Sequence, residues 1–75
     1  MIEQLTNREQ QIYDLIIGEG LNQYKLAKKL SIKPRTIEKY ITQILNKYGV
    51  KNQRELIIQH YKHLIEVIIN ENKMD

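Results

Sequence analysis

The sequence contains no cysteine, which excludes disulfide bonds, thiolate metal sites and a cysteine nucleophile. It also lacks phenylalanine and tryptophan, and it has a single proline and three glycines. No aliphatic run exceeds three residues, far short of the roughly 20 apolar residues that cross a bilayer. The first residues lack the basic start and apolar core of a signal peptide, so we expect a cytoplasmic protein without membrane contact.

What is present indicates one small globular domain, residues 1–75. Hydrophobic residues make up 41% and charged residues 28% of the chain, which is an ordinary globular balance. A domain of this size buries only about 60% of the surface that its unfolded chain exposes. We therefore expect the domain to gain stability from a partner.

The net charge of +3 is distributed unevenly along the chain. Residues 25–54 carry nine Lys and Arg against Glu38 alone, a net charge of +8. One Arg against four acids gives residues 1–24 a charge of −3, and two Lys against four acids give residues 55–75 a charge of −2. A basic segment between acidic flanks is typical of a surface that meets phosphate, and the alternative is a solvated lysine-rich face.

Helical spacing of apolar residues, with start and stop signals, predicts an all-α domain of four helices. Residues 6–9, Thr-Asn-Arg-Glu, fit a capping box at the first helix start. Pro34 suits the first turn of the third helix, because its missing N–H costs nothing there. The predicted helices cover about residues 7–18, 22–30, 34–48 and 53–70.

The third predicted helix has one apolar stripe and a polar outer row. A three-residue connection, 31–33, joins it to the short second helix, and together these elements form a helix-turn-helix arrangement. In such an arrangement the first helix of the pair crosses the DNA backbone and the second enters the major groove. The stripe consists of Ile37, Ile41, Ile44, Leu45 and Tyr48.

The fourth predicted helix carries more apolar surface than one domain can cover. Its apolar residues span an arc of roughly 220°, whereas packing on one side needs a little over 100°. Residues 57, 61, 64 and 68 repeat at 4, 3 and 4, which is the a/d spacing of a coiled coil. We predict a homodimer, because 75 residues cannot surround this helix in a monomer. The predicted dimer interface consists of Ile57, Tyr61, Leu64, Ile65 and Ile68.

Four segments resemble the LuxR/GerE-type helix-turn-helix domain of bacterial transcription regulators. Residues 5–9 match the family's L-T-x-R-E, 26–30 its I-A-x-x-L, 36–40 its T-V-K-x-H and 44–50 its I-x-x-K-L-G-V. The resemblance covers about residues 5–60. It implies sequence-specific binding of double-stranded DNA by a transcription regulator, with the fourth helix as the dimer contact.

The resemblance also implies roles for individual residues of this chain. Glu38, Lys39 and Thr42 are expected at base edges, and Thr36 and Lys47 at phosphates. The chemistry fits, because Lys reaches guanine O6 and N7, Glu accepts from cytosine N4, and Thr touches a thymine methyl. For Glu38, the alternatives are an ion pair with Arg35 or with neighbours of Lys39, or simple loss of the family's base contact.

Helical geometry adds three further residues to the predicted DNA surface. Lys33 and Arg35 lie at the start of the third helix, where the backbone amides favour phosphate. Gln43 lies on the shoulder of the outer row. Together with the residues that the resemblance implies, they complete the predicted interface.

Departures from the family pattern leave a second function open. Glu38 stands where a Lys is usual, Lys33 where a capping Ser is usual, and Gln53 where an Arg is common. The alternative is a protein-interaction module that uses the fourth helix to bind another regulator or RNA polymerase. Family members carry this domain behind a receiver or ligand-binding domain, and only residues 1–4 precede the first motif, so we expect a stand-alone regulator.

Catalytic and cofactor chemistry finds no support in the sequence. His60 and His63 lie three residues apart, but no third ligand accompanies them, so we expect solvated histidines and no metal. No glycine-rich phosphate loop, Ser/His/Asp set or pair of carboxylates is present. We expect a protein that is not an enzyme and needs no cofactor.

Overall fold

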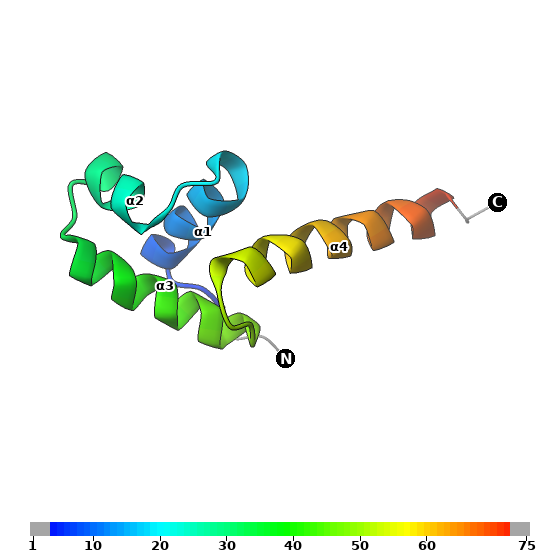
Figure 1. Ribbon diagram of the computed structural model, residues 1–75. Helices are drawn as coiled ribbons and strands as arrows, with labels where there is room; N and C mark the ends of the chain where they lie inside the picture. The colour runs from blue at the N-terminus through cyan, green and yellow to red at the C-terminus, as the bar shows by residue number, and fades with distance from the viewer. Residues whose placement is uncertain (1–3, 73–75) are drawn as a thin grey trace.

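The computed structural model describes residues 4–72, and over these residues the chain forms four α-helices and no strand. The helices are α1 (Asn7–Glu19), α2 (Gln23–Leu30), α3 (Pro34–Tyr48) and α4 (Gln53–Asn72). Helices α1 to α3 form a compact body, and α4 leaves it as a long projecting helix (Figure 1). The predicted all-α helix-turn-helix fold is confirmed.

The first helix begins and ends at two local signals. The Thr6 hydroxyl accepts from the Glu9 amide at 3.2 Å, and Glu9 Oε1 accepts from the Thr6 amide at 2.9 Å, so the predicted capping box is formed. The helix extends one residue beyond the predicted range of about 7–18, to Glu19. The end comes at Gly20, which has φ 66°, a left-handed conformation that glycine adopts without strain.

A tight turn sets the angle between α2 and α3. Asn22 Oδ1 caps α2 by accepting from the Lys25 amide at 2.9 Å. Ser31 ends α2 with a left-handed φ of 55°, and the Ile32 amide then donates to the Ala27 carbonyl at 3.0 Å. Lys33 precedes α3 without a side-chain capping bond. The turn is therefore held by backbone hydrogen bonds, which place the start of α3 beside α2.

The hydrophobic core lies between α1, α2 and α3, and α4 adds little to it. Ile12, Ile16, Leu26, Ile37 and Ile44 have no exposed surface. From α4 only Leu56, 1% exposed, belongs to the buried set, and Ile57 packs against it as a partly buried neighbour. The remaining buried core residues are Tyr13, Ala27 and Ile41.

The last contact of α4 with the body is the hydrogen bond from the Tyr61 hydroxyl to the Ile17 carbonyl at 3.4 Å, and the helix projects beyond it. All residues from Tyr61 to Glu71 are exposed, and the long dimension of the molecule, 50 Å, is about twice the other two, 24 and 21 Å. Ile65 and Ile68 expose 55% and 50% of their surfaces. The wide apolar arc of this helix is therefore uncovered within one chain.

We expect Leu56→Ala to lower the free energy of unfolding by about 2–5 kcal/mol, because it leaves a cavity where α4 joins the body. Urea denaturation followed by circular dichroism measures this change. Lys62→Ala, at an exposed position of the same helix, serves as control and should change stability by less than about 0.5 kcal/mol. Equal effects of the two substitutions would contradict the assignment of Leu56 as the anchor of α4.

Candidate nucleic-acid interface

The outer face of α3 and the residue before it form an exposed polar surface. Ile37, Ile41 and Ile44 face the core, which turns the residues between them outward. Seven of the eight residues predicted to contact DNA are exposed there: Lys33, Arg35, Thr36, Glu38, Lys39, Thr42 and Gln43. No residue among 4–72 forms an ion pair with Glu38, so the alternative pairing with Arg35 is not formed.

Lys47, the eighth predicted residue, points back into the body. Its Nζ donates to Glu9 Oε1 at 2.6 Å and to the Gln4 carbonyl at 3.2 Å. The Lys47 side chain is 18% exposed and the Glu9 side chain 3%. The pair fastens the last turn of α3 to the first turn of α1, a contact that sequence reasoning missed because the partners lie 38 residues apart.

The Glu9 carboxylate is shared between two contacts. The hydrogen bond from Lys47 and the backbone hydrogen bond from Thr6 lower the pKa of Glu9 below its usual value of 4.5, against the opposing effect of burial. The carboxylate is thus ionised at neutral pH. One side chain therefore caps α1 and positions α3.

Neighbouring elements extend the basic surface or hold it in place. Lys25 and Lys28 are exposed on α2, whereas Lys29 pairs with Glu19 at 3.2 Å on the surface. Gln23 Nε2 donates to the Pro34 carbonyl at 3.1 Å and so links the starts of α2 and α3. Gln53, which stands where the family commonly has Arg, donates from its Nε2 to the Leu21 carbonyl at 3.2 Å.

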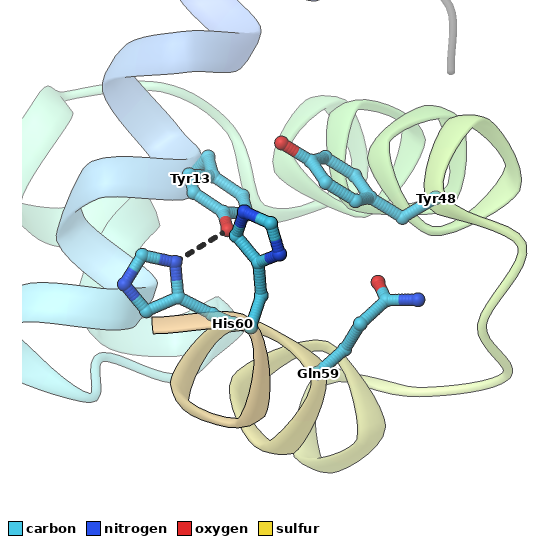
Figure 2. A pocket seen from close by; sticks show the side chains of 5 residues that line it. Tyr13, Tyr48, Gln59 and His60 are labelled. Atoms are coloured by element: carbon cyan, nitrogen blue, oxygen red, sulfur yellow. Dashed lines mark hydrogen bonds between the residues drawn. The ribbon is translucent and has the colours of Figure 1, made fainter. Parts of the chain in front are cut away.

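An aromatic cluster lies where α1, α3 and α4 meet (Figure 2). The Tyr13 and Tyr48 rings stack with centroids 5.1 Å apart, and the Tyr13 hydroxyl lies 3.0 Å from His60 Nδ1. These residues border a cavity of about 520 Å³ together with Gln59 and His63. Burial raises the pKa of Tyr13 to about 12, so its hydroxyl stays protonated.

The expectation of a solvated His60 is wrong, because its ring is half-buried and hydrogen-bonded to α1, whereas His63 is exposed. Among residues 4–72 no three His, Cys, Asp or Glu side chains are grouped so that they could hold a metal ion. The described helices include none that is both long and apolar enough to cross a membrane.

The fold and its exposed polar helix define a helix-turn-helix domain. Residues 3–59 match the family described as "Bacterial regulatory proteins, luxR family". The chain belongs to this family and carries its DNA-binding helix-turn-helix domain. The match ends within the first third of α4, so the projecting part of that helix lies outside it.

Two curated proteins are similar to the chain. "Transcriptional regulatory protein DesR" of Bacillus subtilis (strain 168) is 43% identical over 53 residues, which are 71% of this chain and 26% of that protein. "Probable transcriptional regulator ycf29" of Pyropia yezoensis is 34% identical over 73 residues, which are 95% of this chain and 32% of that protein. The chain thus spans about a quarter to a third of these relatives. No solved structure matches it significantly.

We expect Glu9→Gln to lower the free energy of unfolding by about 1–3 kcal/mol at neutral pH, because Lys47 loses its charged acceptor. Glu19→Gln, which removes the exposed surface pair with Lys29, is the matched control and should cost at most about 1 kcal/mol.

The pair also has a pH signature. Because the pKa of Glu9 is lowered in the folded state, its contribution is complete above pH 4.5 and disappears as the pH falls through the folded pKa. The stability difference between the wild type and Glu9→Gln, measured by denaturation across this range, should shrink on acidification. A difference that does not change with pH would contradict the ionic role of Glu9.

Proposed function

We propose that the chain regulates transcription in the cytoplasm as a homodimer that binds double-stranded DNA sequence-specifically. Each α3 enters the major groove over one half of an inverted repeat. The observation that carries the proposal is the outer face of α3, where basic and polar side chains are exposed opposite the buried Ile37, Ile41 and Ile44. Family membership supports DNA binding, and groove placement and dimerisation are our inference from the helix geometry.

The exposed residues divide by chemistry into base and phosphate contacts. Lys39 and Thr42 lie along the middle of the exposed face and Gln43 lies on its shoulder, where side chains reach base edges. Glu38 beside them accepts from cytosine N4. At the start of α3, the positive end of the helix dipole favours phosphate contacts by Lys33, Arg35 and Thr36.

Lys47 has two functions in this proposal. Glu9 and the Gln4 carbonyl occupy two of the three hydrogens that its ammonium group offers. The third hydrogen donates to a phosphate at the end of α3. Its removal would alter the position of α3 as well as a DNA contact, so other residues test the DNA surface more clearly.

The apolar face of α4 supports the homodimer. Tyr61, Leu64, Ile65 and Ile68 expose between 45% and 55% of their surfaces, and such a contiguous apolar patch on a soluble domain marks an interaction site. Ile57 is partly buried against the domain's own core, so it contributes to the dimer only from the edge of the interface.

We expect Lys39→Ala to cost about 1–3 kcal/mol on the preferred duplex and little on unrelated duplexes, because a base contact is lost. Lys33→Ala should weaken binding to all duplexes and reduce the slope of log K against log salt by about one. A duplex selected from a random DNA pool, titrated by fluorescence anisotropy at several salt concentrations, provides both measurements. A folded wild type that binds no duplex at low salt would contradict the proposal and favour binding of another regulator or RNA polymerase through α4.

We expect Ile65→Asp to abolish the homodimer, because it buries an unpaired carboxylate in the apolar face. Lys62→Asp introduces the same charge at an exposed position outside the predicted interface and should leave the dimer intact. Analytical ultracentrifugation measures both masses, and circular dichroism checks that the helices persist. A wild type that is monomeric at micromolar concentration, with or without DNA, would show that α4 does not form a homodimer.

A further inference from the structure

The apolar seam of α4 has the same residue spacing from either end of the helix. A positive residue flanks one end of the seam and a negative residue flanks the other. The seam residues Ile57, Tyr61, Leu64 and Ile68 are spaced 4, 3 and 4. Arg54 lies seven residues before Tyr61, and Glu71 lies seven residues after Leu64, so both continue the same heptad positions. Arg54 and Glu71 are exposed. Such a seam is self-complementary only when the second helix runs in the opposite direction.

We infer that the two α4 helices of the proposed homodimer pair antiparallel in one register. Tyr61 packs against the partner's Leu64, Ile57 against the partner's Ile68, and Arg54 lies beside the partner's Glu71. The inference rests on the proposed homodimer and adds the direction and register of the pairing, which extends through the part of α4 outside the family match.

The charges at the two ends of the seam favour antiparallel over parallel pairing of the helices. A parallel pair would bring Arg54 against the partner's Arg54 and Glu71 against the partner's Glu71, so both ends of the seam would repel. The antiparallel pair converts the two repulsions into two attractions. The apolar layers between them tolerate either direction, so the terminal charges decide.

The packing of each chain agrees with the antiparallel arrangement. Leu56 and Ile57 fasten the start of α4 to the body, and the Tyr61 hydroxyl donates to the Ile17 carbonyl at 3.4 Å, whereas residues 62–71 are exposed. In the antiparallel pair, each projecting half lies along the half of the partner helix that is anchored to a body. A parallel pair would leave both projecting halves supported only by each other.

The register also sets how far apart the two bodies lie along the paired α4 helices. The twofold axis crosses α4 between Lys62 and His63. At 1.5 Å per residue, the two helix starts then lie about 28 Å apart along the helix axis.

Single cysteine variants test the direction, because the chain has no cysteine of its own. In the antiparallel register two copies of residue 68 are about 16 Å apart along the helices, beyond the reach of a disulfide, which needs about 4.4–6.8 Å between Cα atoms. We expect Ile68→Cys alone to give no covalent dimer under oxidation, and a mixture with Ile57→Cys to give a covalent heterodimer. Efficient cross-linking of Ile68→Cys to itself would overturn the antiparallel direction.

Charge reversal tests the register without altering the apolar layers. We expect Arg54→Glu and Glu71→Arg each to raise the dimer dissociation constant roughly 5- to 30-fold, and the double variant to restore it, because each pair then regains opposite charges. Glu66→Arg, an exposed charge reversal outside the seam, should have no effect. A double variant as weak as the single ones would overturn the register.

These outcomes separate the inference from the proposed function. A wild type that dimerises and binds its duplex, but fails the cross-linking or charge-reversal test, overturns only the antiparallel register. A monomeric wild type overturns the homodimer and the inference with it.

Discussion

The position of α3, which carries the exposed polar face, depends on one buried carboxylate. Glu9 Oε1 accepts from the amide of Thr6, the residue that caps the start of α1, and from Nζ of Lys47 in the last turn of α3. The body has a small core, and without this contact only apolar packing, which is not directional, would set the angle between α1 and α3. The charged hydrogen bonds supply direction, and the Ser31 turn fixes the other end of α3. The helix that presents the polar face is thus held at both ends.

The small hydrophobic core also explains why most of α4 is exposed to solvent. Leu56 and Ile57 pack against the core, and Gln53, His60 and Tyr61 add hydrogen bonds to the body. The rest of the helix gains nothing from packing within its own chain. Isolated helices shorter than about 12–15 residues are marginal in water, and the projecting part of α4, residues 61–72, is of that size. Most helical stability in proteins comes from packing of an apolar face. A second chain along α4 would stabilise the helix and join two DNA-binding bodies. Stability and function then depend on the same surface.

Local sequence signals predicted the helices of this fold well, whereas the sequence did not reveal contacts between residues far apart along the chain. The capping box at Thr6 and the proline at the start of α3 act within a few residues, so their effect can be read from spacing. The bonds from Lys47 to Glu9 and between Tyr13 and His60 span 38 and 47 residues. Each joins two helices, and the spacing of apolar residues does not predict the rotation of one helix against another accurately enough to pair single side chains.

The exposed outer row of α3, unlike these long-range contacts, was predictable, because the exposure of its residues follows from the helical period alone. Lys47 differed from its neighbours because it lies at the edge of that row, where a long side chain can turn either outward to solvent or inward to a carboxylate. Ile57 differed likewise, because its place in the heptad seam did not reveal that the body already covers part of it.

The acidic residue in the middle of the basic face has a physical consequence for specificity. Glu38 is exposed and no described residue pairs with it, so its charge repels the phosphates of any duplex that α3 approaches. Non-specific binding depends on phosphate attraction and therefore weakens on every sequence. On a site that offers cytosine N4 to Glu38, a hydrogen bond offsets this repulsion. In the proposed complex, Glu38 therefore lowers the affinity for all duplexes alike and adds specificity only through its hydrogen bond to a base.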